Sequence, residues 1–278
     1  MNSTPRRDSV QGNWIRQYHE SRGEGPTVVC FPHAGGSASA YFALSAALSA
    51  TAQALIVQYP GRQDRLAEPA LEDLREMADQ AAEALVPWQD RPLVLFGHSM
   101  GSVLAYEVAL RMERWHDRGP VGLIVSGRAA PSVPEDWGIH LMDDEGITEK
   151  LAELAGTPPA LLADKEFLDT IIPPMRADFT ALETYRDLPG SKVACPISAY
   201  CGDQDTDVPR DGFLKWSEHT TAGFTAGYFD GGHFYFQSRE PEVARVISRD
   251  VAAFASRGVR RSSAHEDARS GGGSTFVP

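Results

Sequence analysis

The pentapeptide Gly97-His98-Ser99-Met100-Gly101 lies between an apolar run, Leu93 to Phe96, and a segment with helical periodicity that starts at Ser102. When a strand turns directly into a helix, the turn residue takes a strained backbone conformation, and glycines on both sides prevent collisions with neighbouring backbone. Such a turn lifts the serine hydroxyl out of a sheet and leaves amide groups at the helix N-terminus free to hold an anion. The motif therefore predicts a strand–turn–helix unit that presents Ser99 as a nucleophile.

Short apolar runs that are typical of buried strands recur along the chain. Between most of them lie segments with helical periodicity, such as Leu71 to Leu85 and Ser102 to Trp115. This alternation predicts an α/β fold with a mostly parallel central sheet flanked by helices. The runs expected as strands are Thr27 to Phe31, Ala54 to Tyr59, Pro92 to Gly97, Val121 to Ser126, Ile197 to Cys201 and Phe224 to Phe229.

Residues 131–190 interrupt this alternation, because they contain only short helix-like pieces. These are Gly146 to Leu154, Lys165 to Ile172 and Arg176 to Tyr185, separated by two proline pairs that should end helices. We expect an inserted helical lid over a pocket for an apolar substrate, and the alternative is a surface decoration without a role. The core would then comprise residues 1–130 and 191–257, and the glycine- and serine-rich end, 258–278, would be a disordered tail.

Composition excludes several classes of function. A net charge of −12 over 278 residues argues against a nucleic-acid partner and against an anionic membrane surface. No apolar run is long enough to span a membrane and the first residues are polar, so we expect a cytoplasmic protein. Cys30, Cys195 and Cys201 have spacings that suit neither a zinc site nor a disulfide framework, and we expect buried free thiols. No metal or cofactor is indicated.

A serine nucleophile needs a base, and the base needs an orienting acid, in the chain order serine, acid, histidine. His233 follows the run that ends at Phe229, in a loop thinned by two glycines, so it can approach the turn closely. The other downstream histidines lie in helical or charged surroundings or in the tail. The acid should follow the preceding strand, where Asp203, Asp205 and Asp207 all occur, and Asp205 is our prediction, with Asp203 as a brace for the turn.

The reaction also needs two amide donors for the oxyanion. We assign one to Met100, which follows the nucleophile, and the other to Ala34, in the loop Pro32-His33-Ala34-Gly35-Gly36 after an early strand. This loop is similar to the glycine-rich oxyanion loop of esterases. We expect His33 and His98 to shape their loops rather than to act as bases.

Together these motifs resemble the type II thioesterases, the stand-alone editing enzymes of polyketide and nonribosomal peptide assembly lines. The resemblance covers about Trp14 to Phe254 and is most specific in Phe31-Pro32-His33-Ala34-Gly35-Gly36 and Tyr59-Pro60-Gly61-Arg62. It implies an α/β-hydrolase fold with a helical lid, nucleophile Ser99, acid Asp205, base His233 and oxyanion donors Ala34 and Met100. It also implies a substrate held as a thioester on the phosphopantetheine arm of an acyl or peptidyl carrier protein. The chain begins at its own methionine with no carrier-like region before the hydrolase, which favours the stand-alone type, although an excised domain is the alternative.

We therefore expect a serine thioesterase that acts as a monomer and releases aberrant acyl groups from carrier proteins. One alternative is a carboxylesterase or lipase on free small-molecule esters, because the catalytic parts are the same. Another is a non-catalytic receptor or scaffold with this fold, which the complete set of three catalytic residues disfavours. Arg62 and Arg65 are candidates to meet an acidic carrier surface or its phosphate, and an ordinary solvated loop is the other interpretation.

Overall fold

The computed structural model describes residues 13–21, 23, 25–115, 119–134, 137–154 and 156–270. Within these residues, seven strands form one sheet in the order β1-β3-β2-β4-β5-β6-β7. The pairing of β1 with β3 is antiparallel, and the other five pairings are parallel. The strands are β1 (Ile15–Arg16), β2 (Thr27–Phe31), β3 (Gln53–Val57), β4 (Leu93–His98), β5 (Gly122–Ser126), β6 (Ile197–Gly202) and β7 (Phe224–Phe229).

The predicted α/β class is confirmed, and each of the six predicted runs overlaps a strand, with bounds that differ by at most two residues. The strands β2, β4, β5 and β6 are buried along their whole length, which explains why their sequences are continuously apolar rather than alternating. The sequence analysis missed β1, because two half-buried residues carry no readable periodicity.

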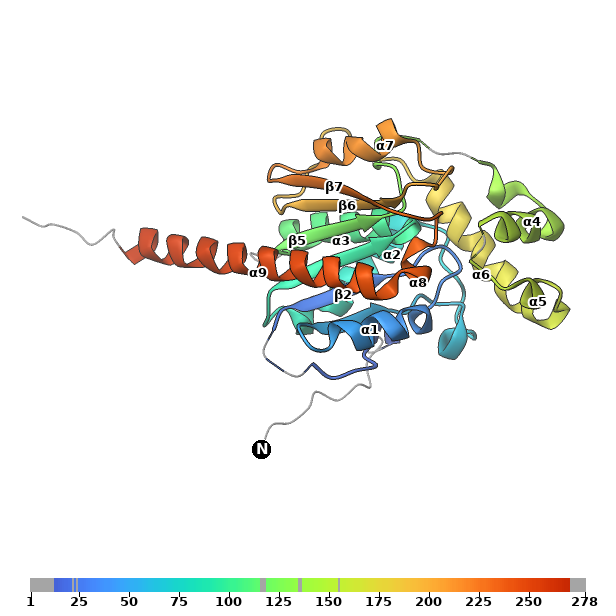
Figure 1. Cartoon of the computed structure of the whole chain (residues 1–278), viewed down its shortest axis with the longest axis horizontal. Helices are drawn as coiled ribbons and strands as arrows, with labels where there is room; N and C mark the ends of the chain where they lie inside the picture. The colour runs from blue at the N-terminus through green and yellow to red at the C-terminus, as the bar shows by residue number, and fades with distance from the viewer. Residues whose placement is uncertain are drawn as a thin grey trace, which may run out of the picture.

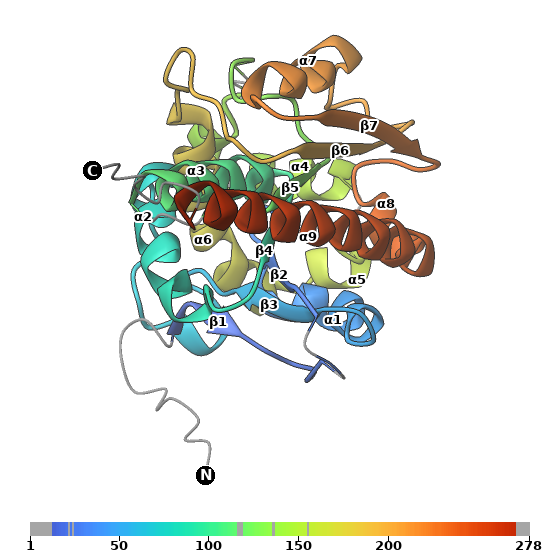
Figure 2. The same cartoon turned by 90° about the vertical axis from the view of Figure 1, so that its left-hand side faces the viewer.

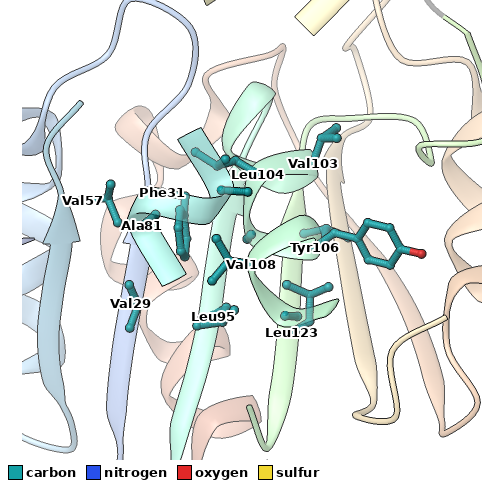
Figure 3. Close-up of a cluster of buried hydrophobic side chains, with 14 of the residues drawn as sticks. Val29, Phe31, Val57, Ala81, Leu95, Val103, Leu104, Tyr106, Val108 and Leu123 are labelled. Atoms are coloured by element: carbon teal, nitrogen blue, oxygen red, sulfur yellow. The ribbon is translucent and has the colours of Figure 1, made fainter. Parts of the chain in front are cut away.

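Helices cover both faces of the sheet (Figure 1). On one face lie α2 (Leu74–Leu85) and α3 (Met100–Trp115), and on the other lie α1 (Phe42–Leu48) and the long α9 (Glu240–Ser270). Figure 3 shows the core under α2 and α3, where side chains such as Val29, Leu95 and Val108 meet between sheet and helix. The remaining short helices are η2 (Ala38–Tyr41), η3 (Gln63–Arg65), η4 (Val86–Trp88), η5 (Ile139–Leu141), α7 (Arg210–Leu214), η6 (Lys215–His219) and α8 (Tyr235–Ser238).

The chain between β5 and β6 forms the inserted helical part. Its helices α4 (Asp144–Leu154), α5 (Pro159–Leu162) and α6 (Lys165–Thr184) gather at one end of the sheet, on the right of Figure 1. They share a small apolar cluster of their own, in which Ile147 and Leu151 of α4 accompany Ile172, Met175 and Phe179 of α6. We call these three helices the lid.

The predicted break at Pro173-Pro174 is wrong, because both prolines lie inside the continuous helix α6. A proline inside a helix costs roughly 3 kcal/mol. Burial of Ile172, Met175 and Phe179, each at most 6% exposed, offsets this cost. Tertiary packing thus overrides a local signal that favours a break.

The C-terminal boundary also differs from the expectation. Helix α9 continues past Gly258, where we expected a disordered tail to begin, and ends at Ser270. In Figures 1 and 2 this helix crosses one face of the sheet and its far end projects beyond it. The rest of the predicted tail, residues 271–278, lies outside the described residues. Among the helices that the structure describes, none is long and apolar enough to cross a membrane.

Candidate active site

Ser99 occupies the sharp turn between β4 and α3. Its backbone has a φ of +54°, in the left-handed region that side chains other than glycine seldom adopt. The Ser99 amide donates a 2.7 Å hydrogen bond to the carbonyl of Ser126 at the end of β5, which holds the strained turn against the sheet. Strain of this kind persists where the surrounding structure imposes it and is concentrated at functional sites.

The glycines of the motif are required by close backbone approach. A Cβ atom on Gly97 would lie 2.0 Å from the carbonyl oxygen of Gly101, and one on Gly101 would lie 2.0 Å from that of Phe31. Contacts this short do not occur, and backbone cannot move aside as a flexible side chain could. The two glycines therefore let α3 begin directly against β2 and β4, which fixes the position of Ser99.

His233 and Asp205 come from the loops that follow β7 and β6. The Nδ1 atom of His233 lies 2.8 Å from Oδ2 of Asp205, whose side chain is 2% exposed. Of the three clustered aspartates, Asp205 is thus the one that contacts His233. Asp203 accepts a hydrogen bond from the Gly231 amide, so it braces the two loops as expected. Asp207 instead pairs with Lys150 of α4 at 3.2 Å.

The two expected oxyanion donors are the backbone amides of Met100 and Ala34. Met100 is the first residue of α3, and the first four amides of a helix have no partner within it. Ala34 lies in the loop after β2 and lines the same cavity as Ser99 and His233. We call residues His33, Ala34, Gly35 and Gly36 the oxyanion loop. It is a tight turn in which the Gly36 amide donates to the His33 carbonyl at 2.8 Å.

Two further histidines, His33 and His98, lie close to Ser99, and His33 lines the same cavity. Burial, with a smaller contribution from the nearby His233, lowers the pKa of His33 to about 3. The same two causes hold the pKa of His98 well below its ordinary value. His98 contacts Ser126 through Nδ1 at 2.8 Å, and Ser126 contacts the hydroxyl of Tyr235 at 2.6 Å. Both imidazoles are therefore neutral packing groups near neutral pH, in agreement with the shaping role expected for them.

The cavity beside Ser99 has a volume of about 120 Å³ and is roofed by the lid. Most of its polar side chains belong to the loops at the carboxyl ends of the strands, with Lys150 of α4 as an exception, whereas its apolar side chains come largely from the lid. Ser99, His33 and His233 are accompanied there by Leu151, Leu154, Phe167, Ile171, Met175 and Phe179. The cavity thus joins a polar floor to an apolar wall, as a substrate with a reactive carbonyl and a hydrocarbon chain requires.

Neither interpretation of Arg62 and Arg65, as a docking surface or as an ordinary solvated loop, is correct. Both side chains are about 5% exposed. Arg62 makes a bidentate ion pair with Asp178 of α6, at 2.6 and 2.8 Å. Arg65 pairs with Glu68 and lies over the ring of Trp14. Asp178 could not be predicted from the sequence, because its partner lies 116 positions away and no local pattern marks it.

A second cluster of serine, histidine and aspartate lies elsewhere in the molecule. His219 at the end of η6 contacts Ser132 through Nε2 at 2.9 Å and Tyr106 through Nδ1 at 3.1 Å. Asp187 is 4.0 Å from Nδ1 of the same ring. Ser132, His219 and Asp187 line a separate cavity of about 450 Å³, which shares only Arg128 and Leu182 with the cavity at Ser99.

Sequence comparison places these features among known proteins. The family model for the thioesterase domain matches residues 26–251. Thioesterase PikA5 of Streptomyces venezuelae is 42% identical over 238 residues, which make up 85% of each chain. Gramicidin S biosynthesis protein GrsT of Aneurinibacillus migulanus is 32% identical over 225 residues, or 80% of this chain and 87% of that protein.

Structure comparison agrees. The type II thioesterase BorB from the borrelidin biosynthetic cluster aligns with a TM-score of 0.80 and 41% identity, over 90% of this chain and 100% of that one. The RedJ thioesterase from the prodiginine pathway in Streptomyces coelicolor aligns with a TM-score of 0.75 and 31% identity, over 84% and 90% of the two chains. The expected α/β-hydrolase fold and the resemblance drawn from the motifs are confirmed.

Proposed function

This chain belongs to the thioesterase family and is a thioester hydrolase, and from that premise we propose that Ser99, His233 and Asp205 form its catalytic triad. One observation carries the proposal. The strained Ser99 and the hydrogen-bonded pair of His233 and Asp205 come from three separate loops, and Ser99 and His233 line one cavity. Strain at a nucleophile and an oriented base are the two requirements of acyl transfer through a serine.

In the proposed reaction, His233 removes the proton of the Ser99 hydroxyl as its oxygen attacks the thioester carbonyl. The carbonyl oxygen becomes an oxyanion, which the amides of Ala34 and Met100 stabilise. Each such donor is worth roughly 2.7–4 kcal/mol in other hydrolases. Asp205 holds the ring of His233 and stabilises its charged form, and its short contact to Nδ1 supports that role.

The tetrahedral intermediate then expels the sulfur, which takes the proton held by His233 and leaves as a thiol, and the acyl group remains on Ser99. A thiol has a pKa of about 8.5, so it departs with less help from an acid than an alcohol needs. His233 next activates a water molecule, which attacks the acyl-serine and releases the carboxylic acid. Ser99, His233 and Asp205, together with the two amide donors, thus suffice for both halves of the proposed reaction.

We propose that the substrates are acyl groups carried on the phosphopantetheine arm of an acyl or peptidyl carrier protein. The relatives named for gramicidin S biosynthesis and the borrelidin cluster support this substrate class. The apolar lid wall supports an acyl chain as the bound group. In such a pathway the enzyme would remove aberrant groups that block a carrier. The three cysteines are buried and form no disulfide, as is usual in a reducing compartment, and this supports a cytoplasmic location.

The substitution Ser99→Ala tests the proposed nucleophile. We expect turnover of an acyl-pantetheine thioester to fall roughly 10⁶-fold, because the covalent step is lost. Ser132→Ala is the matched control, since Ser132 is also within hydrogen-bond distance of a histidine, and it should keep wild-type turnover. Turnover retained by Ser99→Ala would exclude Ser99 as the nucleophile.

A substrate comparison separates the thioesterase from the alternative of a carboxylesterase. The same acyl chain is offered on a carrier-bound pantetheine thioester and on a matched oxygen ester. We expect a kcat/KM for the carrier thioester that is at least roughly 10-fold higher, because a thiolate is the better leaving group. Equal values would favour the carboxylesterase.

A further inference from the structure

Asp178 and Arg62 form a buried charge pair between the lid and the core. The Asp178 side chain is fully buried on α6, and Arg62 follows β3 in the loop at the carboxyl end of the sheet. Burial opposes the charge on Arg62, but Asp178 more than compensates and holds the pKa of the guanidinium above its ordinary value. The guanidinium also lies over the ring of Tyr59, 5.2 Å from its centroid. Two buried charges with this geometry form a rigid unit, because neither can turn away without losing its partner.

Both members of the pair also hold the oxyanion loop. Oδ2 of Asp178 accepts a 2.7 Å hydrogen bond from the Gly35 amide, and it is the same oxygen that one nitrogen of Arg62 contacts at 2.6 Å. That nitrogen of Arg62 also donates to the carbonyl of Gly36 at 3.2 Å. The amide of one loop residue and the carbonyl of the next are thus fixed by one ion pair.

Gly35 is the residue after Ala34, so the bond from its amide to Asp178 fixes the plane of the Ala34–Gly35 peptide. The Ala34 amide belongs to the preceding peptide, His33–Ala34, which meets that plane at the Cα atom of Ala34, so fixing the one plane limits the orientation of the other. From this geometry we infer that Asp178, oriented by Arg62, is a positioning residue that aims the Ala34 amide at the carbonyl oxygen of the substrate. The inference rests on the proposed function, since it assumes that Ala34 is an oxyanion donor.

The lid packs tightly on the same loop. Gly35 has a φ of +69°, and a Cβ atom there would lie 2.1 Å from Cε of Met175, one turn before Asp178 on α6. The second half of α6 therefore contacts the oxyanion loop through an apolar side chain and through a carboxylate. A displacement of about 1 Å in a catalytic group can cost about 100-fold in rate, so this contact is sufficient to govern turnover.

Two double variants isolate the hydrogen bond from the charge. Arg62→Met with Asp178→Asn removes both charges and keeps an oxygen that can accept from Gly35. Arg62→Met with Asp178→Leu removes both charges and replaces that acceptor with a methyl group of similar shape. Neither variant leaves an unpaired buried charge, which is the main cause of unfolding when one partner alone is removed. The effect of the hydrogen bond alone is the difference in kcat between these two variants.

We expect kcat of the leucine variant to be roughly 10- to 100-fold below that of the asparagine variant, with KM within about 2-fold, because the loss falls on the transition state. An alkylboronic acid, which forms a tetrahedral adduct with a nucleophilic serine, gives a readout that a merely structural role would not change. Its inhibition constant should rise in proportion to the fall in kcat. Equal kcat values in the two variants, or a loss confined to KM, would overturn the inference.

The single variant Arg62→Lys keeps the test available if a double variant fails to fold, because it leaves the buried charge of Asp178 paired. It should lower kcat about 3- to 10-fold and weaken the boronic acid by the same factor, since an ammonium group orients the carboxylate less strictly than the bidentate guanidinium does. Unchanged values of both would also overturn the inference. Arg111→Met is the control, because it breaks a partly buried ion-pair network with Asp79 and Glu107 far from the loop. It should lower the melting temperature and leave kcat unchanged.

The choice of substrate separates this inference from the proposed function. Each variant is assayed with the N-acetylcysteamine thioester and with the 4-nitrophenyl ester of one short acyl chain. Both reactions pass through the same oxyanion, so a positioning effect appears with both. If wild type cleaves only the oxygen ester, the thioesterase proposal fails while the role of Asp178 remains measurable.

Discussion

Among the residues that the structure describes, serine, histidine and aspartate gather at Ser99 and at Ser132, and these two clusters differ in orientation rather than in composition. At the first, His233 directs Nδ1 to Asp205 at 2.8 Å. At the second, Nδ1 of His219 contacts the hydroxyl of Tyr106 at 3.1 Å, and Asp187 is 4.0 Å away, too far for a hydrogen bond. A carboxylate can orient a base only when it bonds to the ring nitrogen opposite the nucleophile.

The serines differ as well. Ser99 is held at a positive φ directly before α3, so the amide of Met100 is available to an oxyanion. Ser132 lies in a turn after β5 that no helix follows directly. The first cluster thus has the parts of a hydrolytic site, whereas the second is a hydrogen-bonded network that joins η6 to α3. The same three residue types form the proposed catalytic site in one place and a packing network in the other.

The largest difference should appear when each aspartate loses its charge. Asp205→Asn keeps the shape of the side chain but disturbs the tautomer and orientation of His233, so we expect kcat to fall roughly 10³- to 10⁴-fold. Asp187→Asn should change kcat by less than about 3-fold. Steady-state turnover of an N-acetylcysteamine thioester measures both, and comparable losses would show that the two clusters are not functionally distinct.

A smaller effect should distinguish the histidines by stability. His219→Leu removes the hydrogen-bonding partner of Ser132 and Tyr106 inside the fold, and we expect it to lower the free energy of unfolding by about 1–3 kcal/mol. Its kcat should remain that of wild type, because the ring lines a different cavity from the one at Ser99. Urea unfolding and turnover are measured on the same sample, with His233→Leu as the comparison that loses turnover. A loss of kcat in folded His219→Leu would assign the second cluster a part in the reaction.

The smallest effect concerns pH. The pKa of His33 is about 3 in the folded protein because of burial, whereas a histidine in an unfolded chain has a pKa near 6.5. Below pH 6.5 the unfolded state therefore binds one proton more at this site, and the free energy of unfolding falls by about 1.4 kcal/mol per pH unit until about pH 3. Above pH 6.5 the ring is neutral in both states, so His33 causes no change in the free energy of unfolding with pH.

His33→Gln should remove that part of the slope between pH 6 and pH 5 in urea unfolding. Burial also lowers the pKa of His219, so His219→Leu should reduce the slope in the same direction. A slope that His33→Gln leaves unchanged would mean that His33 is already protonated in the folded protein.

The sequence is informative where function depends on residues that directly follow strands. Ser99, Asp205 and His233 each follow β4, β6 or β7, so the order of apolar runs was enough to propose Ser99 and His233 and to prefer His233 over His219. For the acid it only restricted the choice to the three aspartates after β6. The pairing of Arg62 with Asp178 could not be found in this way. A charged residue on the inner face of a helix shows nothing of its partner, and Arg62 has the same local signature as an exposed loop arginine.

Packing explains the other difference between expectation and structure. Pro173 and Pro174 favour a helix end, and only the tertiary contacts of Met175 and Phe179 show why α6 continues through them. A local conformational preference of a few kcal/mol determines where a helix ends when no tertiary contact opposes it. It does not determine the end of a helix such as α6, whose inner face packs over a cavity.

The two prolines divide α6 into parts with different freedom to change. Before them, residues 165–171 are exposed or half-buried, and after them Met175, Asp178 and Phe179 are buried against the core. Substitutions in the first part, and in α4 and α5, can reshape the lid side of the cavity beside Ser99. The packing of the second part of α6 against the core stays intact. A lineage of such enzymes can therefore acquire new chain-length preferences by ordinary surface mutation, without rebuilding the machinery that breaks the thioester bond.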